Sequence, residues 1–254
     1  MTKGLKEEFL KNWEKYFPGA ELPIAFFYTD DVSAVANANP GRRPRCVVFD
    51  LENVRKGAIL ALDVNQVKCG GGKRYLGFDQ RLSPDFEYFL SCGIPGKLEG
   101  ERYKKSPKLV IEMLAKLPVL DAPAKYIVFK RWDALEDEDA PLVVTFFATM
   151  DILSGLFTLA NFDEADPNAV IAPFGSGCAS IVYYPYLEGQ SRHPRAVLGL
   201  FDISARPAIS EQTLAFSVPM PKFVRMVADM PESFLTTTSW GEIRQRMAKG
   251  IVSS

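Results

Sequence analysis

The chain has 254 residues, of which 47% are hydrophobic and 24% are charged, and its formal net charge is −1 at pH 7. A chain of this length buries about three quarters of the surface that it exposes when unfolded, so no disulfide or metal is required for folding. The near-neutral charge argues against a dedicated nucleic-acid-binding protein, which is usually strongly basic. We therefore expect a soluble globular protein with no nucleic-acid partner.

The first half of the chain contains alternating helix and strand patterns. In chain order they predict a helix over residues 5–17, a strand over 23–28, a basic loop over 33–45, a strand over 46–49, a helix from Leu51, a strand over 59–64, and helices that begin after Ser83 and Ser106. Asp50 is the predicted cap of the helix from Leu51, and Gly57 is its predicted end. Serine followed by proline is typical of a cap and the first helical residue.

The second half continues in the same way. It predicts strands over 126–130 and 142–147, a helix over 152–160, a strand over 170–174, a helix that begins near Cys178, strands over 196–201 and 214–218, and helices from Pro219 and Ser239. Residues 141–160 are apolar over the length of a membrane span, but Asp151 in the middle and the absence of a basic flank favour a strand and a helix. The pattern predicts one α+β domain over residues 1–254, with a mixed β-sheet and helices packed on it.

The four cysteines form no C-x-x-C pair, so the signatures of a zinc ribbon and of thioredoxin are absent. The chain also opens without the pattern of a signal peptide. We therefore expect a cytoplasmic protein with reduced thiols, no disulfide and no membrane partner.

A glycine triplet beside a cysteine is the first candidate site. Glycine allows a backbone to approach a ligand closely, and the amides of such a turn, together with neighbouring cations, suit an anion. A second glycine turn precedes Cys178 at a predicted helix start. We expect these turns to bind an anionic small molecule or cofactor, with Lys68 and Arg206 as further cations. The predicted ligand-binding residues are Cys69, Gly70, Gly71, Gly72, Lys73, Arg74, Gly175, Ser176 and Gly177.

Two alternatives use the cysteines directly. In one, Cys46, Cys69 and Cys178 ligate zinc or an iron–sulfur cluster, since thiolates suit such centres. In the other, Cys178 is a catalytic nucleophile whose pKa is lowered at the helix start. The only histidine, His193, lies in a predicted exposed loop, so a base for Cys178 is not evident. The sequence leaves open whether the protein is an enzyme, what Cys92 does, and whether the chain forms a homo-oligomer.

Cys69 and Cys178 are predicted to face one cleft. Each follows a predicted strand, at 59–64 and at 170–174, and strand ends are where a sheet gathers binding groups. The prediction assumes that both strands run in the same direction in one sheet. Antiparallel strands would instead separate the two sulfur atoms by more than about 15 Å.

Several short motifs resemble one known family, the domain-of-unknown-function 169 family. They are Cys46 followed by Asn53–Gly57, Cys69–Gly71 followed by Leu76–Phe78, Gly175–Ala179, and Pro219–Pro221 followed by Met230–Leu235. Cys46, Cys69 and Cys178 match that family's pattern. The resemblance implies a single domain that spans the chain, and it supplies no reaction.

Overall fold

The computed structural model describes residues 3–35, 38 and 46–252. A seven-stranded sheet with the order β2-β3-β1-β4-β7-β6-β5 forms its centre. The strands are β1 (Ile24–Thr29), β2 (Leu60–Leu62), β3 (Tyr126–Arg131), β4 (Val143–Ala148), β5 (Val170–Ile171), β6 (Ala196–Gly199) and β7 (Leu214–Pro219). Neighbouring strands are antiparallel except β5 and β6, which are parallel. The α+β class and the mixed sheet are thus confirmed.

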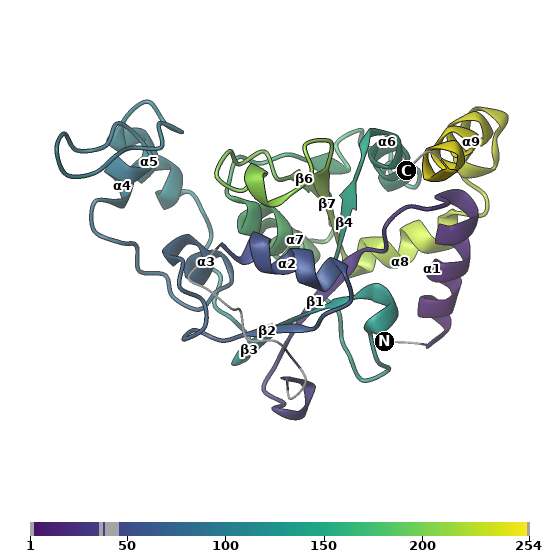
Figure 1. Cartoon of the computed structure of the whole chain (residues 1–254), viewed down its shortest axis with the longest axis horizontal. Helices are drawn as coiled ribbons and strands as arrows, with labels where there is room; N and C mark the ends of the chain where they lie inside the picture. The colour runs from purple at the N-terminus through teal and green to yellow at the C-terminus, as the bar shows by residue number, and fades with distance from the viewer. Residues whose placement is uncertain (1–2, 36–37, 39–45, 253–254) are drawn as a thin grey trace.

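Helices cover both faces of this sheet (Figure 1). The helices α1 (Lys3–Tyr16), α6 (Met150–Ala160), α8 (Met220–Asp229) and α9 (Thr238–Val252) pack on one face. The opposite face carries α2 (Val47–Arg55), α3 (Gly70–Tyr75), a π-helical turn η3 (Ala179–Tyr183) and the α7 helix (Tyr184–Gly189) that continues it. Along β4, Val144 and Phe146 contribute to the first core and Val143 and Phe147 to the second, as the two-residue period of a strand requires. No helix in the described part of the chain is both long and apolar enough to cross a membrane.

The strand predicted at 46–49 is wrong. Helix α2 begins at Val47, and Cys46 stands directly before it. Val47, Val48, Leu51 and Val54 are all buried, which is a helical spacing rather than the alternation of a strand. Asp50 consequently lies in the first turn of α2 and does not cap a later helix. The predicted end of this helix is confirmed, because α2 stops at Arg55 and Gly57 has a φ of +99°.

The glycine triplet is helical, not a turn. Gly70, Gly71 and Gly72 begin α3, and Cys69 is its N-cap, whose Sγ accepts a hydrogen bond from the Gly72 amide at 3.5 Å. A Cβ atom at Gly72 would lie 3.1 Å from Val67 Cγ1, so the absence of a side chain lets this first turn lie close to the preceding loop.

Three other helix starts were predicted from caps. The start after Ser106 is confirmed: α5 spans Pro107–Ala115, and Ser106 Oγ accepts from the Leu109 amide at 3.4 Å. The start after Ser83 is wrong, because α4 (Phe86–Phe89) follows Asp85 instead. The capping box predicted at Ser239 for the last helix is wrong, because α9 begins at Thr238 and Thr237 Oγ1 accepts from the Trp240 amide. Most of the predicted basic loop, with Arg42, Arg43 and Arg45, lies outside the described residues.

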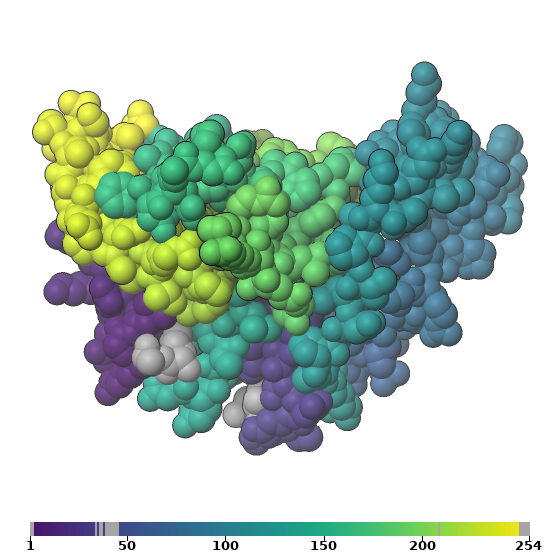
Figure 2. Space-filling view, turned by 180° about the vertical axis from the view of Figure 1, so that it is seen from behind, coloured from purple at the N-terminus to yellow at the C-terminus, as the bar shows by residue number. Residues whose placement is uncertain are grey.

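Residues 79–120, here called the arm, leave the rest of the molecule and return to it. The arm contains α4 and α5, which pack on each other. At its base the Ala122 amide donates to the Gly77 carbonyl at 2.9 Å, and the Gln80 side chain donates to the Leu120 carbonyl. Figure 2 shows the arm rising beside the remainder of the chain, the body, with a hollow between the two. The arm and the body thus form two walls of a concave surface.

Candidate functional site

A cavity of about 240 Å³ lies between the arm and the body. The arm contributes mainly apolar side chains, among them Phe86, Phe89 and Tyr103. The body contributes three helix starts and the loop that follows β6. Sites for small molecules are typically concave and mostly apolar, with a few polar groups, and this cavity has that character.

A cysteine lies at each of the three helix starts. Cys46 precedes α2, Cys69 caps α3, and Cys178 lies in the first turn of the helix that contains η3 and α7. All three line the cavity, and all four cysteines of the chain are free thiols. Cys92, in the arm, is exposed and lines a different depression.

Cys69 and Cys178 meet at one cavity for a reason other than the predicted one. The strands that precede them, β2 and β5, are at opposite edges of the sheet. The strand pairings also make β2 and β5 run in opposite directions. The cysteines reach the cavity because each strand is followed by a loop, residues 63–68 and 172–176, that crosses toward the same face.

Burial keeps two of these thiols neutral. Burial raises the pKa of Cys46 to about 11. Burial also raises the pKa of Cys178, with a smaller contribution from the nearby Cys46, although Ser176 Oγ lies 3.2 Å from Cys178 Sγ. The expected lowering at the helix start is therefore wrong: desolvation outweighs the helix amides, and the Gly177 amide already donates to Asp202 Oδ2 at 3.2 Å.

The predicted base and cations lie elsewhere. His193 is exposed in the loop between α7 and β6 and does not line the cavity. Arg74 donates to the Gln80 carbonyl at 3.0 Å, and Arg206 donates to the Thr213 carbonyl at 2.6 Å. Lys68 donates to the Asn65 carbonyl at 2.6 Å. The anion prediction thus receives no support from the geometry of these cations.

The predicted ligand-binding residues divide into two groups. Those in the lining are Cys69, Gly71, Gly72, Gly175 and Ser176. Those outside it are Gly70, Lys73, Arg74 and Gly177.

The match to a family model covers residues 20–229 and therefore all the cavity residues named above. The chain belongs to the DUF169 family, described as uncharacterised ArCR. No curated protein and no solved structure matches the chain. This DUF169 match leaves out residues 1–19 and 230–254, so a single domain over 1–254 stays a prediction.

Within the ranges 3–35 and 46–252, no group of three or more His, Cys, Asp or Glu side chains is arranged to hold a metal ion. The zinc or iron–sulfur site predicted at Cys46, Cys69 and Cys178 therefore has no support in the geometry. The structure instead adds Glu101, Tyr103 and Asp202 to the candidate site, which the sequence pattern did not indicate. Only Asp202 had a signal nearby, because it follows a predicted strand end.

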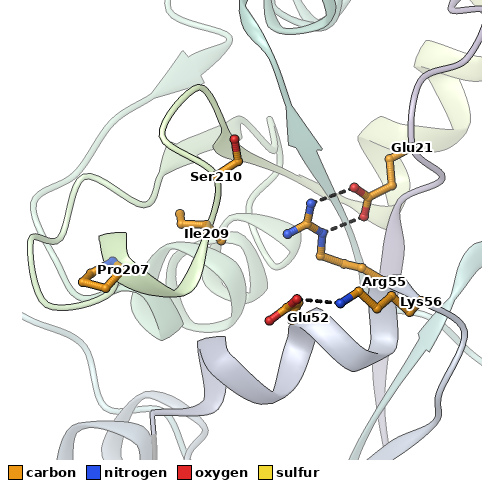
Figure 3. A pocket seen from close by; sticks show the side chains of 7 residues that line it. All are labelled: Glu21, Glu52, Arg55, Lys56, Pro207, Ile209 and Ser210. Carbon is orange, nitrogen blue, oxygen red and sulfur yellow. Dashed lines mark hydrogen bonds and ion pairs between the residues drawn. The ribbon is translucent and has the colours of Figure 1, made fainter. Parts of the chain in front are cut away.

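A second depression lies between α2 and residues 207–210 and is more open to solvent (Figure 3). Its charged side chains are paired with one another: Arg55 with Glu21 at 2.6 Å, and Lys56 with Glu52 at 2.6 Å. Because these charges already have partners, we place the candidate site at the cavity of the cysteines.

The four thiols are expected to differ in their rate of alkylation. At pH 7, iodoacetamide should modify the exposed Cys69 and Cys92 first, Cys46 more slowly and Cys178 last. A raised pKa lowers the thiolate fraction, so the rate at Cys46 should increase about tenfold per pH unit up to about pH 11. Peptide mass spectrometry at several pH values measures each rate. Modification of Cys178 as fast as that of Cys92 would contradict the burial argument.

Proposed function

We propose that this DUF169 chain binds a small organic molecule with an apolar body in the cavity between the arm and the body of the protein. The ligand lies at the glycine-bearing helix starts near Cys69 and Cys178. The convergence of aromatic side chains from the arm with three thiols from separate helix starts carries this proposal. Such a lining provides apolar contact over most of a ligand and polar contact at a few points.

Exposed apolar side chains at the cavity support the same function. Phe174, Phe201 and Ile203 line the cavity and are 52%, 54% and 71% exposed. Phe89 approaches from the arm and is 37% exposed. Covering such surface is favourable by about 25 cal/mol per Å² of apolar area. A ligand that fills the cavity removes part of this surface from water.

The neutral thiols distinguish this proposal from the one in which Cys178 is a nucleophile. A nucleophilic cysteine reacts as the thiolate, whereas burial favours the protonated form of Cys46 and Cys178. A protonated cysteine behaves as a small apolar residue with a weak donor. We therefore assign Cys46 and Cys178 to the wall of the cavity, in contact with the ligand's apolar part.

The test uses the neutral fluorescent probe N-phenyl-1-naphthylamine. Ile203→Trp places a large ring at the lining and is expected to weaken probe binding at least about tenfold. The matched control is Val32→Trp, because Val32 is 63% exposed and lies outside the lining. The fluorescence titration of Val32→Trp should equal that of the unchanged protein.

Two results would overturn the proposal. One is that the unchanged protein does not bind the probe at micromolar concentrations. The other is that both tryptophan variants bind it equally well. Thermal unfolding of both variants shows that each is folded before its affinity is compared.

A further inference from the structure

A second cavity adjoins the first. Its volume is about 260 Å³, and it is lined by residues 172–175 and 199–202 together with Ser180. Four residues line both cavities and therefore form the partition between them: Phe174, Gly175, Phe201 and Asp202. Each cavity alone is smaller than the roughly 300–1,000 Å³ of a typical small-molecule pocket, whereas the two together fall within that range.

The second cavity suits an apolar group. Ala172, Pro173 and Leu200 line it, in addition to the two phenylalanines of the partition. Its polar side chains are Ser180 and Asp202, and both already have partners in the protein.

The hydrogen bonds of these two side chains are internal. The Ser180 hydroxyl donates to the Gly177 carbonyl at 2.9 Å and accepts from the Leu200 amide at 3.3 Å. One carboxylate oxygen of Asp202 accepts from the Gly177 amide, and the other accepts from the Ser204 amide and hydroxyl. Because these polar groups are satisfied within the protein, the second cavity offers a ligand mainly apolar contact.

The partition consists of side chains that can move without the sheet. The Phe174 and Phe201 side chains are 52% and 54% exposed, and side chains exposed to water exchange rotamers within picoseconds to nanoseconds. The backbone beneath Phe174 is anchored, because its carbonyl accepts from the Tyr184 hydroxyl at 2.9 Å. Rotation of the two rings therefore connects the cavities while the loops that carry them stay in place.

The backbone is strained beside this partition. Leu200 has a φ of +66°, which is unfavourable for a residue with a side chain. Leu200 is buried and tightly packed, since a Cβ atom at Gly177 would lie 2.9 Å from Leu200 Cδ2. The chain turns here between β6 and Phe201, which lines both cavities. Strained residues concentrate at ligand sites, which supports a binding role for the second cavity.

We propose that the ligand is elongated and carries an unbranched apolar chain, whose end passes the rings of Phe174 and Phe201 into the second cavity. The inference rests on the proposed function of the first cavity. An unbranched chain is the slimmest apolar group and passes the partition with the least displacement of the rings. Each methylene group that enters the second cavity strengthens binding by leaving water.

Two alcohols of different length test the chain: hexan-1-ol and decan-1-ol, each titrated against bound N-phenyl-1-naphthylamine. Decan-1-ol is expected to bind at least about tenfold more tightly, because its additional methylene groups enter the second cavity. Ala172→Trp places a ring at a residue that lines only the second cavity. It should weaken decan-1-ol at least about tenfold and leave hexan-1-ol unchanged, whereas Ile203→Trp should weaken both alcohols. Val32→Trp is again the control.

A photoreactive chain locates the end of the ligand in the unchanged protein. Decan-1-ol with a diazirine near its last carbon, after irradiation and peptide mass spectrometry, should label residues that line only the second cavity: 172–173, 180 or 199–200. This label decides the inference if the new ring of Ala172→Trp turns toward solvent and both alcohols bind normally.

Three results would overturn the inference and leave the first cavity standing. They are equal affinities of the two alcohols, an equal loss for both in a folded Ala172→Trp, and a label found only outside the second cavity. If N-phenyl-1-naphthylamine itself does not bind, the proposed function falls as well.

Discussion

Gly199→Ala is expected to lower the free energy of unfolding by about 3 kcal/mol, because the new side chain overpacks a tight helix–strand contact. A Cβ atom at Gly199 would lie 2.1 Å from Ser180 Cβ and 2.2 Å from Ser180 Oγ. Ser180 has no room to move, since its hydroxyl donates to the Gly177 carbonyl and accepts from the Leu200 amide. Relief of the clash must shift the helix that carries Cys178, so probe binding should weaken as well.

The matched control is Gly189→Ala in α7. A Cβ atom there would meet Pro219 Cβ at 3.5 Å, an ordinary contact. Alanine in a helix is favoured over glycine by about 0.5–1 kcal/mol, so this variant should be as stable as the unchanged protein or more stable. Urea unfolding followed by tryptophan fluorescence measures both variants. Equal stability of Gly199→Ala and Gly189→Ala would contradict the packing argument, whereas rescue of Gly199→Ala by Ser180→Gly would support it.

Lys130→Met is expected to lower the free energy of unfolding by about 3–5 kcal/mol, because it removes one member of a buried ion pair. The Lys130 side chain in β3 is 2% exposed, and its Nζ lies 2.8 Å from Oδ2 of Asp139, whose side chain is 6% exposed. The same Nζ lies 3.2 Å from Glu136 Oε2, but the Glu136 side chain is 74% exposed. The variant therefore leaves the Asp139 carboxylate buried without its buried cation.

Glu136→Gln is the control for this pair. An exposed ion pair contributes about 0–1 kcal/mol, so the control should be nearly as stable as the unchanged protein in urea. Adding Asp139→Asn to Lys130→Met removes the remaining buried charge and should recover part of the lost stability. A loss in Lys130→Met no greater than that in Glu136→Gln would show that the buried pair is not stabilising relative to methionine.

The sequence predicted the central strands well. The strands β1, β3, β4 and β7 have six residues each, and most of these residues are apolar, β-branched or aromatic. The strand prediction for Cys46–Phe49 was wrong because valine and phenylalanine in a short run also suit a strand. The helical spacing becomes visible only when Leu51 and Val54 are included. Local propensity is a weak guide where tertiary packing decides.

The site was predicted only in part. Cys69 and Cys178 line one cavity, as predicted. The prediction assumed that the strands before them run in the same direction, and in the sheet these strands run in opposite directions. The pKa of Cys178 was misjudged because burial is not visible in the sequence, and burial outweighs the helix start. Tyr103 and the other arm residues reach the cavity only through the tertiary fold, so no spacing in the sequence connected them with Cys178.

The short edge strands give the two ends of the sheet a thermodynamic link. Strand β2 has three residues and β5 has two, and short edge elements open locally at a lower free energy than central strands. The loops after these strands lead to Cys69 and to Cys178, which line one cavity, so opening of either edge is expected to disturb that cavity. A ligand that contacts both cysteines, as proposed above, is expected to stabilise both edges together. Residues that share no hydrogen bond across the sheet would thereby be coupled through the ligand.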